Sequence, residues 1–242
     1  MNDFKQQLNS KKYDFLRTNP LFGKQLQMLC VSGSNSYGTN IDSSDLDIRG
    51  VALELPKDLL LLKQSRNIAD DNTDTTIYQF NSFLDLLIKG QPNIIELLGL
   101  REQDYLFKTY IFEEILKNKD MFLSQHILHR IKGYTKDEYK NNSKISNEKK
   151  RNKSLMHIIR LYAFGIEIAN GNIITYRDKE QSLLLDIRNG KFTDTEFKNI
   201  LKEYKEKFEI ATNKSKIPED VNVEQIEKMK IKINKRNICE CI

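Results

Sequence analysis

A glycine–serine pair is followed at short range by two aspartates that alternate with aliphatic residues. An apolar run over residues 26–31 leads into Gly33 and Ser34 as a buried strand leads into a tight turn, and a glycine lets the backbone approach a ligand closely. The pair therefore predicts a small phosphate-binding turn. Alternating residues share one face of a strand, so Asp45 and Asp47 would present two carboxylates together. A divalent cation between them would relieve the repulsion of their charges.

Each of these short patterns also has an ordinary structural interpretation. Gly-Ser turns are common, and Ser-Asp-x-Asp in isolation is more typical of a solvated loop or a helix cap than of a catalytic site. The order of the elements favours chemistry, because the buried strand and the turn are followed by a Tyr37–Gly38 pair that ends a short helical turn. A strand with an acidic polar face then begins at Asp45. We therefore interpret the segment as a nucleotide-phosphate site beside a magnesium site.

The segment from Ser32 to Val51 resembles the signature of the DNA polymerase beta-like nucleotidyltransferase superfamily, in which Gly-Ser holds the triphosphate and an acid–hydrophobe–acid strand holds the metals. It is most similar to bacterial and phage nucleotidyltransferases associated with RNA repair, which read Gly-Ser-x-x-Tyr-Gly-Thr and then Ser-Asp-x-Asp-x-Arg-Gly. Two later stretches support the resemblance, at residues 92–98 (Pro-Asn-Ile-Ile-Glu-Leu-Leu) and 157–161 (His-Ile-Ile-Arg-Leu). The chain carries Asn35 where relatives often have arginine, so one cationic contact is missing or is supplied elsewhere.

The resemblance implies an active site with three carboxylates around divalent ions. It assigns Asp45 and Asp47 to catalysis and metal binding. Related sites take one acid from a neighbouring strand, and Asp74 stands at the head of the next predicted strand. Asp74 is therefore the candidate third carboxylate and general base, with a helix or strand cap as its alternative role. The implied nucleotide contacts are Gly33, Ser34, Tyr37 and Arg49.

A predicted helix over residues 152–169 carries a second group of polar side chains. Lys153, His157 and Arg160 recur at helical spacing, so they share one stripe while aliphatic residues line another. Facing the carboxylates across a cleft, this stripe would neutralise triphosphate charge or guide the phosphates of an acceptor. The alternative is a basic, solvated helix face with an incidental histidine.

The predicted reaction is attack of an acceptor hydroxyl on the α-phosphate of a nucleoside triphosphate such as ATP, with release of pyrophosphate and two-metal catalysis by Mg²⁺ or Mn²⁺. This makes the chain a metal-dependent nucleotidyltransferase, and an RNA end is the favoured acceptor. Two alternatives stay open. An enzyme of the same fold would adenylylate a protein or a small molecule, and a catalytically silent relative would only bind nucleic acid.

Charge and composition fit a partner such as RNA. The net charge is +5, and it comes mostly from basic clusters at residues 144–153 and 228–236. RNA would explain both clusters, although solvated helix faces and an AT-rich genome are alternatives. No apolar run approaches the roughly 18 residues that cross a membrane, and the first residues lack the apolar core of a signal peptide. We expect a cytoplasmic protein with no membrane partner. Three cysteines are too few for a disulfide framework, and the oligomeric state is not predicted.

The elements expected around these residues predict an α/β (α+β) fold. The sequence pattern indicates strands over 26–31, 45–55 and 74–80 and a polar loop over 64–73. Helices are expected over residues 81–88, 110–119, 123–133, 152–169, 194–208 and 223–235, with Gly133, Gly171 and Gly190 as stops and Thr193 or Asp194 and Asn222 as caps. The resemblance implies a small mixed sheet with helices on one side. We predict a catalytic domain over 1–123 and a mainly helical domain over 124–242.

Overall fold

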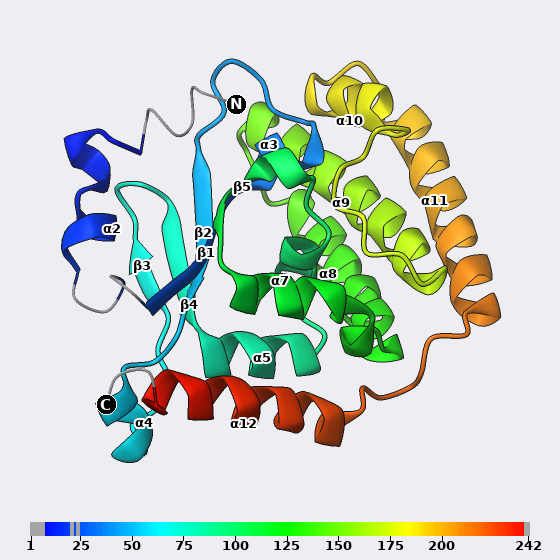
Figure 1. Cartoon of the computed structure of the whole chain (residues 1–242). Helices are drawn as coiled ribbons and strands as arrows, with labels where there is room; N and C mark the ends of the chain where they lie inside the picture. The colour runs from blue at the N-terminus through cyan, green and yellow to red at the C-terminus, as the bar shows by residue number, and fades with distance from the viewer. Residues whose placement is uncertain (1–7, 20–21, 23–24, 240–242) are drawn as a thin grey trace.

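The computed structural model describes residues 8–19, 22 and 25–239. Within these residues a five-stranded mixed sheet, in the order β3-β4-β2-β1-β5, forms the centre of the amino-terminal half (Figure 1). The strands are β1 (Leu26–Ser32), β2 (Asp47–Ala52), β3 (Ile68–Asp70), β4 (Thr75–Gln79) and β5 (Tyr105–Lys108). Strand β2 runs antiparallel to β1 and parallel to β4. The α/β class with a mixed sheet is therefore confirmed.

Helices account for most of the remaining chain. In Figure 1, α8 to α11 form the right-hand side and α12 runs along the bottom. The α-helices are α2 (Phe15–Thr18), α3 (Gly33–Tyr37), α4 (Pro56–Leu60), α5 (Phe80–Ile88), α6 (Pro92–Ile95), α7 (Tyr110–Lys117), α8 (Gln125–Asn142), α9 (Glu148–Ala169), α10 (Gln181–Arg188), α11 (Asp194–Lys214) and α12 (Val223–Cys239). The 3₁₀ turns are η1 (Lys11–Tyr13), η3 (Glu96–Leu98), η4 (Glu102–Asp104) and η5 (Lys119–Phe122). No described helix combines the length and apolar character that a membrane-crossing segment needs.

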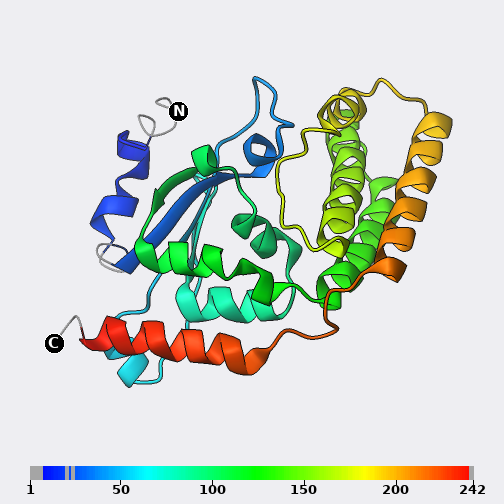
Figure 2. The same cartoon turned by 45° about the vertical axis from the view of Figure 1, so that its right-hand side comes forward.

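Both faces of the sheet are buried, because apolar residues occupy consecutive positions of β1. Met28 and Cys30 point into the larger core, which the helices that follow the sheet complete. Leu29 and Val31 alternate to the opposite face. There they pack in a second cluster with Tyr13 and other apolar residues of the amino-terminal segment. Figure 2 shows α2 on the side of the sheet away from the long helices. The main helices thus lie on one side, as predicted, and the first residues cover the other.

The hydrophobic core continues across the predicted boundary between residues 123 and 124. Leu123 is buried in the same cluster as residues from both halves. Helix α12, last in the described chain, returns to pack against α5 and α4 of the first half (Figure 1). Its Asn237 amide donates a hydrogen bond of 2.8 Å to the carbonyl of Glu54. The division into 1–123 and 124–242 remains a prediction, and α12 packs on the first of these segments.

Most expected helix ends are confirmed by their caps. Thr193 and Glu196 form a capping box at the start of α11, and Asn222 accepts a hydrogen bond from the N–H of Gln225 at the start of α12. Gly171 and Gly190 follow their helices with positive φ angles of 85° and 70°.

Three expectations about secondary structure were wrong. Gly133 lies inside α8 rather than at its end, because the helix keeps packing against α9 beyond it and packing outweighs the weak helix propensity of one glycine. The expected loop over 64–73 contains β3, which pairs with β4. Strand β5 was not predicted, because it has only four residues and its register with β1 is irregular.

Candidate active site

The Gly-Ser turn lies directly against one of the two aspartates. Strand β1 ends at Ser32, and Gly33 opens α3 with a φ of +64°. A Cβ atom placed on Gly33 would lie 1.8 Å from Oδ2 of Asp47. The Asp47 carboxylate therefore occupies the space that any other residue at position 33 would fill. Helix α3 ends at Tyr37 and is capped by Gly38, whose φ is +76°, as the Tyr-Gly pattern predicts.

Asp45 and Asp47 do not share a strand, which corrects the expectation from their alternation. Strand β2 begins at Asp47, whose partner on β1 is Ser32. On one side of β2, strand β1 ends at Ser32 and the polypeptide continues as α3. On the other side, β4 begins at Thr75, which pairs with Ile48. Residues before Asp47 therefore have no strand to pair with. Asp45 lies in the preceding loop and is exposed.

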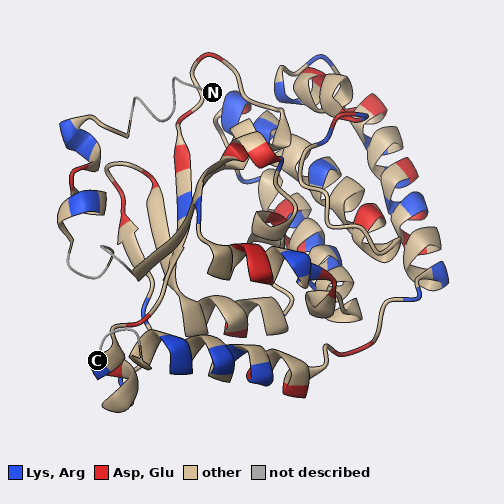
Figure 3. Cartoon of the chain, viewed as in Figure 1, with Lys and Arg blue, Asp and Glu red and all other residues tan. Residues whose placement is uncertain are grey.

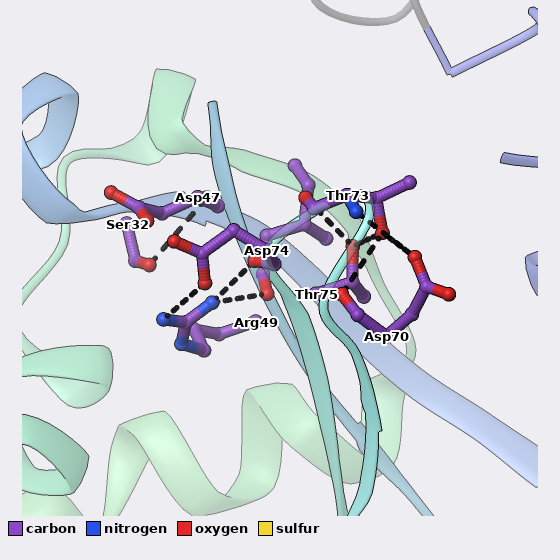
Figure 4. A network of polar contacts seen from close by, with 8 residues as sticks. Ser32, Asp47, Arg49, Asp70, Thr73, Asp74 and Thr75 are labelled. Carbon is purple, nitrogen blue, oxygen red and sulfur yellow. Dashed lines mark hydrogen bonds and ion pairs between the residues drawn. The ribbon is translucent and has the colours of Figure 1, made fainter. Parts of the chain in front are cut away.

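Asp47 and Asp74 form a pair of neighbouring carboxyl groups beside Arg49 (Figure 4). Burial, a hydrogen bond with Asp74 and the negative charge of Asp74 together raise the pKa of Asp47 to about 7, while Arg49 and Lys153 act in the opposite direction. The pKa of Asp74 is lowered, chiefly by the hydrogen bond from Asp47. One proton shared by two close carboxyl groups explains these opposite directions.

Arg49 holds Asp74 in place at the head of β4. Its guanidinium lies 3.1 Å from Oδ1 of Asp74 and donates a second hydrogen bond of 2.6 Å to the Asp74 carbonyl. Asp74 has a φ of +44°, a left-handed conformation that aspartate tolerates better than most residues. Arg49, predicted to contact the nucleotide, lines the cavity beside the turn and also positions Asp74.

The carboxyl pair suits a divalent cation, because two oxygen donors in a half-buried site favour a hard ion over two free negative charges. Among the described residues, no group of three or more histidine, cysteine, aspartate or glutamate residues is placed to hold a metal ion. Asp45 instead lines a neighbouring hollow together with Asp74. The structure thus brings together two of the three predicted carboxylates and leaves Asp45 next to them on the outer side.

A buried network lies beneath the turn and connects the two supporting sequence motifs. Arg160 of α9 forms an ion pair with Glu96, and both side chains are less than 5% exposed. The Tyr37 hydroxyl donates a hydrogen bond of 2.8 Å to Glu96, and the Arg160 guanidinium stacks 3.7 Å from the centre of the Tyr37 ring. The carboxylate of Glu96 therefore neutralises Arg160, and Tyr37 is held from two sides.

The predicted stripe on α9 divides into a part that reaches the cavity and a part that does not. Lys153 is exposed at the edge of the cavity, and its charge acts on both Asp47 and Asp74. His157 lines the same cavity. Arg160 is 3% exposed and is paired with Glu96, so it supports the turn from below. The helical period showed that these residues share a face, although it could not show how deeply each one is buried.

The cavity itself has a volume of about 260 Å³. Its lining residues include Ser32, Gly33, Ser34, Tyr37, Asp47, Arg49, Lys153 and His157, together with Tyr78, Asn93 and Glu96, which were not predicted as site residues. Glu96 carried a signal, because it is the acid of the Pro-x-x-x-Glu-Leu-Leu stretch. Tyr78 and Asn93 had no recognisable sequence signal, because a single polar residue in a strand or a short helix has no distinctive spacing.

A methyl group at position 33 is expected to displace the Asp47 carboxylate. We expect Gly33→Ala to reduce nucleotide transfer by about a hundredfold, the effect of roughly 3 kcal/mol of lost positioning. Gly171→Ala is the matched control, because that residue has a φ of +85° and no atom within 4 Å of its added methyl group. Both variants pay about 1 kcal/mol of backbone strain, and only Gly33→Ala should lose transfer. Equal transfer by the two variants in a pyrophosphate-release assay would contradict this assignment.

The structure keeps His157 neutral. Burial first, and then the charges of Arg160 and Lys153, lower the pKa of His157 to about 3, and its Nδ1 accepts a hydrogen bond from Arg160. The unfolded histidine binds a proton near pH 6.5, so stability is full above that pH and falls as the pH drops towards 3. We expect His157 to cost about 2 kcal/mol at pH 5 relative to pH 7.5. Urea unfolding of wild type and His157→Gln at both pH values should show a smaller loss in the variant.

Comparison with protein families places the whole arrangement in a known group. The model of the family described as "RlaP: RNA repair pathway DNA polymerase beta family" matches residues 11–232. A comparison with curated proteins found no match. The family match covers the turn, the carboxyl pair, the Glu96–Arg160 network and the helices that support them. This chain therefore belongs to the RNA repair pathway DNA polymerase beta family and has the nucleotidyltransferase fold that its Gly-Ser and Asp-x-Asp motifs predicted.

Proposed function

We propose that the protein transfers a nucleoside monophosphate from a nucleoside triphosphate to a hydroxyl group at an RNA end. The observation that carries this proposal is the position of Asp47, which lines one cavity together with the Gly33 turn and lies next to Asp74. A phosphate-binding turn and a carboxyl pair are the two parts that phosphoryl transfer needs side by side. Membership of a family named for RNA repair supports the choice of acceptor.

The chain's own residues would bind and orient the triphosphate. Ser34 and the backbone N–H groups of the α3 turn would donate hydrogen bonds to its terminal phosphates, and Lys153 at the cavity edge would offset their charge. Asp47 and Asp74 would hold Mg²⁺ or Mn²⁺, and Asp45 of the preceding loop is a further candidate ligand. When bound, these ions supply an acidified acceptor hydroxyl and charge neutralisation at the leaving pyrophosphate.

Asp74 is the proposed general base of the site. Its pKa is lowered, so its carboxylate is ionised at neutral pH and can accept the proton of the attacking hydroxyl. Arg49 fixes the orientation of that carboxylate through the ion pair with Oδ1. Tyr37 and Arg160 do not touch the reacting groups in this proposal. They hold α3 in position through Glu96.

An acidic hollow beside Asp74 favours a second candidate function. Asp45, Asp70 and Asp71 line it together with Asp74, and a surface of this charge attracts cationic groups and repels phosphates. An acceptor that reached the site through this hollow would be a protein or a small molecule with positive charge. Adenylylation of such an acceptor is therefore tested alongside transfer to RNA.

Labelled nucleotides can separate the candidates. Purified protein is incubated with Mg²⁺ and each of the four α-labelled triphosphates, first with total RNA and then with total protein from the same cells. We expect label in the RNA fraction and none without Mg²⁺. Label in the protein fraction alone would favour the second candidate. RNA binding with no transfer in either fraction would support a silent binding module.

A further inference from the structure

The fold pairs several residues of one of the two basic clusters with acids of the same molecule. In the cluster at residues 228–236, Lys230 lies 3.1 Å from a carboxylate oxygen of Asp85. On the same helix, Lys232 pairs with Glu114 of α7 at 2.6 Å. Figure 3 shows Lys and Arg positions repeating along α12. The pairs attach α12 to the sheet half, so this cluster has a structural role.

The other cluster, at residues 144–153, has no such partners. Within the described part of the chain, none of its basic side chains forms an ion pair. Lys144, Lys149, Lys150 and Lys153 are exposed. They surround the start of α9, whose next turns reach the active-site cavity. Positive charge that is not neutralised within the molecule is available to an anionic partner.

A second cavity opens beside this cluster, where α8 ends and where α9 and α11 begin. Its volume is about 350 Å³. The described residues that line it include three cations, two aromatic rings and one acid: Lys140, Arg151, Lys198, Tyr139, Phe197 and Asp194. Phe197 is buried and Tyr139 is partly buried. Cations next to aromatic rings are the combination that binds a nucleotide phosphate and its base.

Arg151 provides an independent indication of a ligand. The Nε atom of its guanidinium is buried and has no hydrogen-bond partner within the described structure. Its backbone is fixed, because the Asn142 amide donates a hydrogen bond of 2.9 Å to the Arg151 carbonyl. An unsatisfied buried donor is costly. An anionic oxygen in the cavity would satisfy it with a charge-assisted hydrogen bond.

We propose that this cavity binds one nucleotide of a single-stranded nucleic acid, the acceptor of the transfer reaction. Arg151 and Leu155 line this cavity, whereas Lys153 and His157 line the active-site cavity. A step of two residues turns roughly 200° around a helix, so the two cavities lie on opposite faces of α9. An acceptor strand would leave the active site past Lys153 and cross the first turn of the helix to reach Arg151.

Cavity size and lining favour a single strand over other anions. A volume of this size admits one nucleotide and excludes a duplex. An acidic peptide would use the cations alone, whereas a base could also stack on the partly buried Tyr139 ring, which Lys205 approaches to 5.6 Å. RNA and DNA share the required chemistry. The identification of the strand as the acceptor rests on the proposed function, while the binding itself does not.

Fluorescence anisotropy with a short labelled single-stranded RNA, measured without nucleotide, tests the proposal. Lys140→Ala/Lys198→Ala removes two exposed cations and should weaken binding about tenfold at about 0.15 M salt. It should also reduce the slope of log affinity against log salt by about 0.7 for each lost contact. Asp194→Asn should tighten binding, because it removes the acid from the lining. An unchanged affinity in both variants would overturn the proposal.

The matched control is Lys228→Ala/Lys235→Ala, which removes the same charge from exposed positions of α12. At about 0.15 M salt it should bind RNA within about twofold of wild type, because screening then limits the reach of an exposed charge to about 8 Å. An equal loss in the control would mean general electrostatic attraction and would overturn the site. Displacement of the RNA by polyglutamate as readily as by unlabelled RNA would also overturn it.

Two further arms keep this inference separate from the proposed function. Competition with unlabelled RNA or DNA of the same sequence identifies which strand the cavity holds, and displacement by either supports the site. Label transfer to RNA is measured in parallel on the same variants. Site-dependent binding without transfer would reject the proposed function and keep the site. Transfer to RNA, with RNA binding unaltered in Lys140→Ala/Lys198→Ala, would support the proposed function and reject the site.

Discussion

Asp47→Asn should abolish nucleotide transfer and leave the protein folded. The carboxylate of Asp47 fills the space beside Gly33 and lies next to Asp74. Removing it eliminates an effect of several kcal/mol on the barrier, so we expect a loss of about a thousandfold or more. The measurement is pyrophosphate release at saturating triphosphate with Mg²⁺. Retention of even a tenth of the activity would contradict the central role of Asp47.

The fold should tolerate this substitution because it removes one of two carboxyl groups that repel each other. Burial and the charge of Asp74 raise the pKa of Asp47, so its ionised form is disfavoured in the folded protein. At pH 8 the free energy of unfolding of Asp47→Asn is therefore expected to equal or exceed that of wild type. Asp71→Asn, an exposed acid in the neighbouring hollow, is the charge-matched control and should retain transfer.

The same assay tests whether Asp45 is a third metal-binding carboxylate. Asp45 is exposed and lies outside the carboxyl pair. If it completes the metal site, Asp45→Asn should lower transfer as strongly as Asp47→Asn and should raise the Mg²⁺ concentration required for half-maximal activity. Transfer at the level of Asp71→Asn would instead assign both metal-binding carboxylates to Asp47 and Asp74.

Glu96→Ala should have the largest effect on stability. The substitution leaves the Arg160 guanidinium buried without its counterion and leaves the Tyr37 hydroxyl without its acceptor. Breaking a buried pair by removing one partner costs about 3–5 kcal/mol. Urea unfolding at pH 7.5 measures the loss. Triphosphate binding should weaken as well, because Tyr37 ends the helix that follows the Gly-Ser turn.

A double variant provides the control for that prediction. Glu96→Leu/Arg160→Met replaces both buried charges with apolar side chains, so neither is left unpaired. Its free energy of unfolding should lie closer to wild type than that of Glu96→Ala. If the losses of stability in Glu96→Leu and in Arg160→Met add up to the loss in the double variant, Glu96 and Arg160 do not depend on each other. Recovery of stability without recovery of triphosphate binding would confirm that the pair positions Tyr37.

Local sequence was sufficient to predict the elements that bear the site. The apolar run ending at Ser32, the Gly33 turn and the Tyr-Gly ending of α3 all follow from properties of adjacent residues. Asp74 was predicted through family resemblance, and the structure brings it next to Asp47. The parallel pairing of β2 with β4 is the cause. Pairing between strands that are far apart in sequence has no local signal.

The failures have a common physical origin in tertiary contacts. Alternation placed Asp45 on a strand, yet a strand extends only as far as its neighbours do, and β1 ends at Ser32. Periodicity placed Arg160 on the same helix face as Lys153. Arg160 is nevertheless buried, because it forms an ion pair with Glu96, which is distant in the sequence. Glycine is typical of a helix end, yet α8 continues beyond Gly133 because the helix packs against α9 there.

The return of α12 to the sheet half determines the order in which the protein can be completed. Translation produces the strands and the Gly-Ser turn early, but α12, which lies against α5, emerges from the ribosome last among the described elements. Until then, the core residues that Ile226, Met229 and Ile233 of α12 pack against are exposed to chaperones and proteases. A nascent chain that stops after α11 would carry all the predicted catalytic residues and still lack the helix that closes their core.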